Sequence, residues 1–135
     1  MPSMIHAIAR LFVEGDQFSP AEAETLAGFR FTQKSERGVL ATTGRYKGRP
    51  LPYGWAELEA TAPGDFLMTV DGPFFEAAEA LTRAALTQGE VDVRLHVDVE
   101  HDDQCHLELA PGVLAAVSRL GVPLTMSCYE KGEKE

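Results

Sequence analysis

Hydrophobic and polar residues alternate without interruption from Val91 to Glu100, in the sequence VDVRLHVDVE. A period of two is typical of a strand that has one face on a core and the other in water. The valines favour the same interpretation, because β-branched side chains fit a pleated surface well. We therefore predict a central strand over residues 91–100, around which the rest of the chain is organised.

Weaker patterns predict three helices and several further strands. The start of the first helix is well marked, because Ser19 is a good N-cap, Pro20 suits the first turn and Glu22 completes a capping box; the helix is expected to end at Gly28. Two more helices are expected after Pro73 and Pro111, over residues 73–88 and 111–120. Strands are expected at residues 5–13, 29–32, 55–60, 105–109 and 122–129, with 66–70 as a short strand or a connector.

This order of elements predicts an α+β fold, with a mixed, mainly antiparallel sheet and helices on one face. The first six elements match a ferredoxin-like βαββαβ arrangement, and a further βαβ unit follows. With 135 residues in the chain, we expect a single domain over residues 1–129. Residues 130–135 are charged and lack apolar anchors, so we expect them to form a disordered C-terminal tail.

Charge and composition limit the classes of partner and the cellular compartment that we expect. The chain has 21 acidic and 12 basic residues, a net charge of −9, which argues against nucleic acid as a partner and suits a basic protein. The first ten residues lack the charged and continuous apolar regions of a signal peptide, so we expect none. No apolar run approaches the ~20 residues that a membrane helix needs, and we therefore expect a cytoplasmic protein with no membrane contact. Alternation points Cys105 and Cys128 inward, and we expect both to be reduced and buried.

Several short motifs lie at the ends of the predicted elements. They are Gly15-Asp16 before the Ser19-Pro20 helix start, Gly54 before Trp55-Ala-Glu-Leu, Leu107-Glu-Leu before the third helix, and Leu120-Gly-Val before the strand that ends at Tyr129. Together they resemble a bacterial family, domain of unknown function 4279, over nearly the whole chain. The resemblance implies one α+β domain and no established activity, and it supplies no catalytic residues.

The first candidate site is the segment between the strands expected at 29–32 and 55–60. It is rich in glycine and proline, it has no regular period, and five of the twelve basic residues fall at positions 34–49, which we call the basic loop. Cations among glycines can wrap an anion or an acidic ligand, and long connections without secondary structure are often functional. An ordinary exposed loop is the alternative. The candidate ligand-binding residues are Arg37, Arg45, Lys47, Arg49 and Trp55.

The second candidate site is the polar face of the hairpin expected after the central strand. A three-residue loop at 101–103 places Asp98 opposite His106 and His96 opposite Glu108. His96, His106 and Glu108 are weak candidates for metal ligands. Because each imidazole already has a carboxylate opposite it, we expect no tight metal site and no cofactor.

Two classes of function fit these observations. We expect no enzyme, because there is no GxSxG elbow, and Cys105 and His106, as neighbours on a strand, point to opposite faces. The main hypothesis is a non-enzymatic, cytosolic interaction domain, for example an immunity-type protein that blocks a basic toxin or nuclease. The alternative is a small-ligand, anion or metal-binding domain that uses the basic loop or the hairpin face at 96–108. A broad acidic and aromatic surface favours the first; a pocket lined by His96 and Glu108, or an anion among the loop arginines, favours the second.

Overall fold

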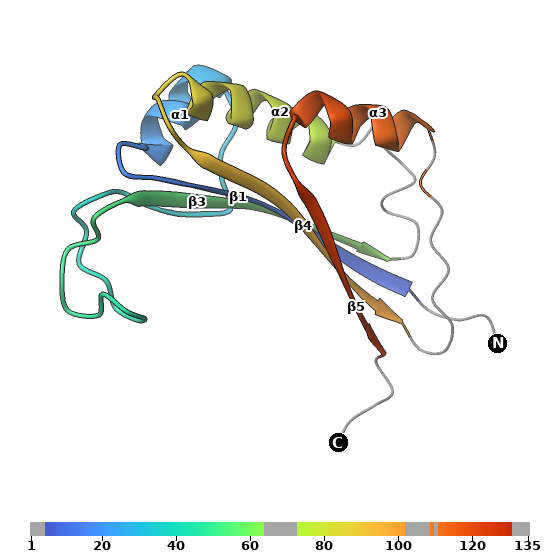
Figure 1. The fold of residues 1–135 in the computed structure, drawn as a ribbon, viewed down its shortest axis with the longest axis horizontal. Coiled ribbons are helices and arrows are strands. Elements are labelled where there is room, and N and C mark those ends of the chain that lie inside the picture. The colour runs from blue at the N-terminus through green and yellow to red at the C-terminus, as the bar shows by residue number, and fades with distance from the viewer. Residues whose placement is uncertain (1–4, 64–72, 102–108, 110, 131–135) are drawn as a thin grey trace.

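The computed structural model describes residues 5–63, 73–101, 109 and 111–130 (Figure 1), with residues 5, 6, 61–63 and 73 described by their backbone alone. Strands and helices largely alternate along this part of the chain. In order they are β1 (Ile5–Gly15), α1 (Pro20–Ala27), β2 (Gln33–Ser35), β3 (Gly54–Pro63), α2 (Pro73–Leu86), β4 (Asp92–His101), α3 (Pro111–Leu120) and β5 (Leu124–Glu130).

The strands form one sheet in the order β2-β3-β1-β4-β5. The pairs β2-β3, β3-β1 and β1-β4 are antiparallel, whereas β5 runs parallel to β4. All three helices of the described residues lie on the same face of the sheet (Figure 1). This confirms the predicted class, an α+β fold with a mixed, mainly antiparallel sheet. Strand β3 lies between β1 and β2, and β1 lies between β3 and β4; the finer ferredoxin-like assignment stays a prediction.

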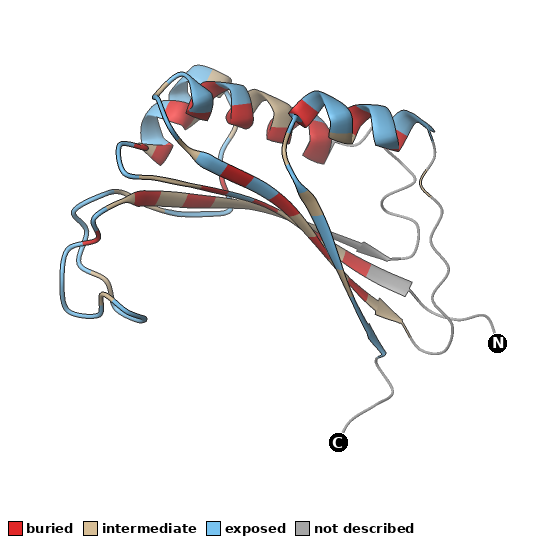
Figure 2. Cartoon of the chain, viewed as in Figure 1, coloured by how far each residue is buried: buried red, intermediate tan, exposed pale blue. Residues whose placement is uncertain are grey.

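Alternation along the strands puts every second side chain into the core under the helices. The register sets Leu11 of β1 beside Leu58 of β3 and Leu95 of β4, so apolar rows run across the sheet. Helix α2 packs its buried stripe onto these rows, and Figure 2 shows the buried positions of β4 alternating with exposed or intermediate ones. The buried residues of the three elements are Ala7, Ala9, Leu11 and Val13 in β1, Val93, Leu95, Val97 and Val99 in β4, and Phe74, Phe75, Ala77, Ala78, Leu81, Thr82, Ala84 and Ala85 in α2.

The first helix has the N-cap and the C-cap that the sequence predicts, but the predicted capping box is wrong, because the Ser19 N–H donates to Gln88 rather than to the Glu22 side chain. The Ser19 hydroxyl accepts a hydrogen bond from the backbone N–H of Glu22, and Gly28 takes the left-handed conformation with a φ of 81°. The side-chain amide of Gln88, just after α2, accepts from the Ser19 N–H at 2.6 Å and donates to the Ser19 carbonyl at 3.0 Å. The N-cap of α1 is therefore fixed to the end of α2.

The strand predicted over residues 29–32 is wrong, because the strand of this segment, β2, begins only at Gln33. The ring of Phe31 is buried edge-on against Phe18, with ring centroids 6.2 Å apart, and the Phe31 N–H donates to a Glu24 carboxylate oxygen at 2.7 Å. The alternation in this segment therefore reflects the burial of one aromatic side chain rather than a place in the sheet.

The prediction that residues 91–100 form the central strand is wrong. The middle strand of the five is β1, and β4 lies next to it. The predicted hairpin is also wrong, because both edges of β4 are occupied. Val99, for example, is paired with Ala7 of β1 on one side and with Cys128 of β5 on the other. Residues 66–70 and the partner segment of the predicted hairpin, 102–108, lie outside the described residues.

Cys128 is exposed, contrary to the prediction. Cys128 shares the helix-covered face with Leu124 and Met126, as alternation indicates. It is nevertheless exposed because β5 is the edge strand, and Met126 on the same face is also 37% exposed. Helix α3 buries Val113, Ala116 and Leu120 and leaves Leu114 in solvent. Cys105 and residues 131–135 lie outside the described residues. No helix in the described ranges is long and apolar enough to cross a bilayer.

Candidate functional site

The face of the sheet opposite the helices carries the polar residues of the alternating strands, and we call it the open face. Its side chains come from the positions between the buried ones in β1, β3 and β4. Among the described residues it presents six carboxylates and two guanidinium groups. They are Glu14, Glu57, Glu59, Asp92, Asp98 and Glu100, with Arg10 and Arg94.

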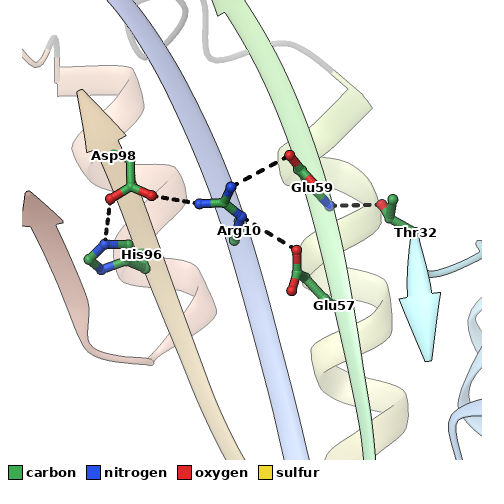
Figure 3. Close-up of polar contacts among 6 residues, drawn as sticks. All are labelled: Arg10, Thr32, Glu57, Glu59, His96 and Asp98. Carbon is green, nitrogen blue, oxygen red and sulfur yellow. Dashed lines mark hydrogen bonds and ion pairs between the residues drawn. The ribbon is translucent and has the colours of Figure 1, made fainter. Parts of the chain in front are cut away.

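Arg10 lies at the centre of the open face and links three strands (Figure 3). Its guanidinium donates to Asp98 of β4 at 2.6 Å and lies 3.4 Å from Glu57 and 3.8 Å from Glu59 of β3. All four side chains are half-buried, so the network is only partly screened by solvent. One cation therefore holds together the carboxylates of two neighbouring strands.

His96 continues this network toward β5. Its Nε2 lies 2.9 Å from Asp98 Oδ1, and its Nδ1 lies 2.5 Å from the Thr125 hydroxyl. Burial raises the pKa of Asp98, but the hydrogen bonds and charges of His96 and Arg10 outweigh it and hold that pKa below its ordinary value. The carboxylate is therefore charged at neutral pH and poorly suited to donate a proton.

The metal-binding candidates are not brought together in the part of the chain that the structure describes. Both ring nitrogens of His96 are engaged by neighbouring side chains. Within the described ranges, no group of three histidine, cysteine or acidic residues is placed to hold a metal ion. His106 and Glu108 lie outside those ranges.

The connection between β2 and β3, residues 36–53, is more ordered than the sequence indicates. Its two arms bond to each other: the Gly38 N–H donates to the Leu51 carbonyl at 2.9 Å, and the Ala41 N–H donates to the Arg49 carbonyl at 3.0 Å. Isolated bridges join Leu40 to Pro50 and Ala41 to Lys47. The segment has no helix or strand, as predicted, but these contacts between its arms fold it back on itself.

Both ends of this connection are fixed at the start of α1. At the first end, the Glu36 carboxylate accepts from the Ser19 hydroxyl at 3.0 Å and from the Ala21 N–H at 2.9 Å. At the other end, Gly54 passes so close to the Phe18 carbonyl that a side chain there would overlap it. The connection is thus held in one place relative to the sheet.

A cavity of about 660 Å³ lies between this connection and the open face. The volume is within the range of small-molecule pockets, roughly 300–1,000 Å³. Trp55 of β3 lines the cavity, and its ring stacks on Phe12 with centroids 6.1 Å apart. Tyr46 and Tyr53 of the connection also line the cavity and pack edge to face.

The predicted ligand-binding residues are only partly assembled. Arg45 and Trp55 line the cavity, whereas Arg37, Lys47 and Arg49 do not. The Arg37 guanidinium donates to the Asp16 carbonyl at 3.3 Å. Arg49 donates to the Arg45 carbonyl at 3.0 Å and lies over the Tyr46 ring, so part of the basic loop holds its own shape. The role of these residues in ligand binding stays a prediction.

Sequence reasoning missed Arg10, Glu14 and the two loop tyrosines. Arg10 lies within the strand predicted at residues 5–13, but its partners depend on the sheet register, which brings residues about 50 and 90 positions away beside it. The tyrosines carried a weak signal, as aromatic residues in a polar loop.

Scans against protein-family models, curated proteins and solved structures returned no match for this chain. The resemblance to domain of unknown function 4279 has no support from these comparisons and stays an expectation.

Proposed function

We propose that this chain is a non-enzymatic interaction domain whose open face binds a basic protein partner. The observation that carries the proposal is the charge of that face, where six carboxylates stand against two guanidinium groups among the described residues. A negative surface steers a positive partner toward it and disfavours acidic ones. An immunity-type protein that blocks a basic toxin or nuclease is the finer form of this proposal.

The acidic surface continues beyond the open face, at the end where β1 stops and β4 begins. A second cavity there, of about 750 Å³, is lined by four carboxylates: Glu14, Asp16, Glu90 and Asp92. The stacked pair of Phe12 and Trp55 lies next to this acidic region, because Trp55 is the cross-strand neighbour of Glu14. An aromatic anchor among charged residues is a common composition for a protein interface.

Proton-transfer chemistry has less support on this face. A histidine beside an aspartate, as in His96 and Asp98, is a common arrangement for proton transfer. Here, however, the Asp98 carboxylate is also ion-paired with Arg10, and His96 is also hydrogen-bonded to Thr125. These contacts favour a structural role, in which the pair joins β4 to its neighbours on both sides.

The test compares two variants with the same change of charge. Glu59→Gln with Asp92→Asn removes two charges from the open face, whereas Glu22→Gln with Glu76→Gln removes two exposed charges from the helices. Each protein, immobilised, is exposed to native host extract, and the retained proteins are identified by mass spectrometry. We expect a basic protein to be retained by the wild type and the helix variant, and to be lost from the open-face variant and at high salt.

The purified partner then gives the affinity for each protein. An equal affinity for the two variants would contradict the proposal, and so would a partner that is itself acidic.

A further inference from the structure

The cavity between the β2–β3 connection and the open face has charged side chains of both signs in its lining. Its sheet side carries Glu14, and its loop side carries Arg45. Lys34 also lines it, but the Lys34 ammonium is ion-paired with Glu24 of α1. Neither Glu14 nor Arg45 has a side-chain hydrogen bond or ion pair with another described residue; the Arg45 guanidinium lies 5.6 Å from the centroid of the Tyr46 ring. One unpaired charge of each sign is therefore left in the lining.

The remaining lining suits a small organic molecule that is partly apolar. Trp55, Tyr46 and Tyr53 supply aromatic surface, and Thr42 and Thr43 supply hydroxyl groups. Stiff aromatic rings give contact area at a low cost in conformational entropy, and hydroxyls adapt their hydrogen bonds to the ligand. The loop wall is already folded before any ligand enters, which reduces the entropy cost of binding.

A ligand with a single charge does not fit this lining well. An anion would be attracted by Arg45 and repelled by Glu14. A cation would be attracted by Glu14 and repelled by Arg45. Only a ligand with both charges pairs with both groups, and each charge-assisted hydrogen bond is stronger than a neutral one.

We propose that this cavity binds a zwitterionic small molecule of the α-amino acid class. The ammonium group lies toward Glu14, the carboxylate lies toward Arg45, and the carbon side chain lies against Trp55. Glu14 also belongs to the open face, but the two proposals can fail independently, because neither Glu14 nor Arg45 is changed in the test of the basic partner.

The test uses the one tryptophan of the chain, which lines the cavity. Trp55 fluorescence is excited where tyrosine does not absorb, and it is followed while each standard L-α-amino acid other than tryptophan is added at millimolar concentration. The amino acid that binds most tightly is then compared with its amide, which lacks the carboxylate, and with its N-acetyl derivative, which lacks the ammonium. We expect each derivative to bind about 10- to 100-fold more weakly, because it loses one charge-assisted contact.

Two substitutions assign the two contacts. Glu14→Gln should weaken the parent amino acid by about 10- to 100-fold and remove its advantage over the N-acetyl derivative. Arg45→Gln should weaken it similarly and remove its advantage over the amide. The matched controls are Glu22→Gln and Arg30→Gln, which change exposed charges that do not line this cavity and should leave binding unchanged. Circular dichroism checks that every variant is folded.

Three results would overturn the inference. The first is the lack of a saturable fluorescence change with any amino acid. The second is equal binding of a singly charged derivative and its parent, which would indicate a simple anion or cation site. The third is unchanged binding by the folded Glu14→Gln or Arg45→Gln protein.

Discussion

Gly54 is the position at which one added carbon atom should do the most damage. A Cβ there would overlap the Phe18 carbonyl oxygen and would lie 3.2 Å from the carbonyl carbon and 3.4 Å from Pro20 Cδ. Favourable carbon contacts are about 3.5–4.0 Å long. The obstacle is backbone, and Ser19, the next residue, is fixed by Gln88 and Glu36. Gly54→Ala must therefore move β3 away from the start of α1.

We expect this substitution to lower the free energy of unfolding by about 3 kcal/mol, at the upper end of what overpacking usually costs. With a urea m-value of about 2 kcal/mol/M, the midpoint would fall by roughly 1.5 M. Gly28→Ala is the control, because Gly28 has a positive φ of 81° but open space around it. That control should cost about 1 kcal/mol, from backbone strain alone.

Equilibrium urea unfolding, followed by circular dichroism, measures both variants. A Gly54→Ala protein within 0.5 kcal/mol of the wild type, roughly the size of a neutral surface change, would refute the close approach of β3 and Phe18.

Three further predictions concern single side chains. Thr82→Val should stabilise the protein by about 1 kcal/mol in urea unfolding, because Thr82 is only 2% exposed and its buried hydroxyl has no hydrogen-bond partner among the described residues. Asp98→Asn should cost about 1.5 kcal/mol near pH 6, and this difference from wild type should shrink as the pH falls from about 5 through the unfolded-state pKa of about 3.9. The sign follows because the folded-state pKa of Asp98 is lowered, so acid protonates the unfolded chain first. Cys128 should react with a thiol reagent in the native protein at the rate of an exposed thiol, and Cys128→Ser should remove this fast reaction.

Each of these predictions has a clear contrary result. A Thr82→Val protein that is less stable would show that the hydroxyl is hydrogen-bonded. A wild-type advantage over Asp98→Asn that stays constant down to pH 3 would show that the folded-state pKa is not lowered. If Cys128 is labelled by the thiol reagent only after denaturation, Cys128 is buried in the native protein.

The parts of the fold that the sequence predicts well are those determined by neighbouring residues. The helix start at Ser19 depends on the next three residues, and its end depends on the freedom of Gly28 to take a positive φ. The alternation of β1 and β4 was likewise visible from their own residues, because a period of two divides a strand into a buried face and a polar face.

The errors arose where the answer depends on distant partners. The pairing of β4 with β5 joins residues 29 positions apart, whereas the sequence favoured a local hairpin. Cys128 lies on the predicted face of its strand. That this strand forms the edge of the sheet, and so leaves Cys128 exposed, cannot be predicted from the residues of the strand alone. The candidate site was half predictable for the same reason: Arg45 and Trp55 stood out as residue types, whereas the placement of Glu14 in the same cavity depends on the register of β1 and β3.

The uncovered side of the sheet also affects how this chain can diverge. Along β1 and β4 the residues that build the core and the residues that face water occupy alternate positions, so the two sets can change almost independently. At Ala9, which is fully buried, even one added methyl group must displace its neighbours. At the exposed positions between, outside the network of Arg10, His96 and Asp98, charge and size are free to vary with little loss of stability. Descendants of one ancestral sequence could therefore keep this backbone and recognise unrelated partners, and a shared fold among them would say little about what each one binds.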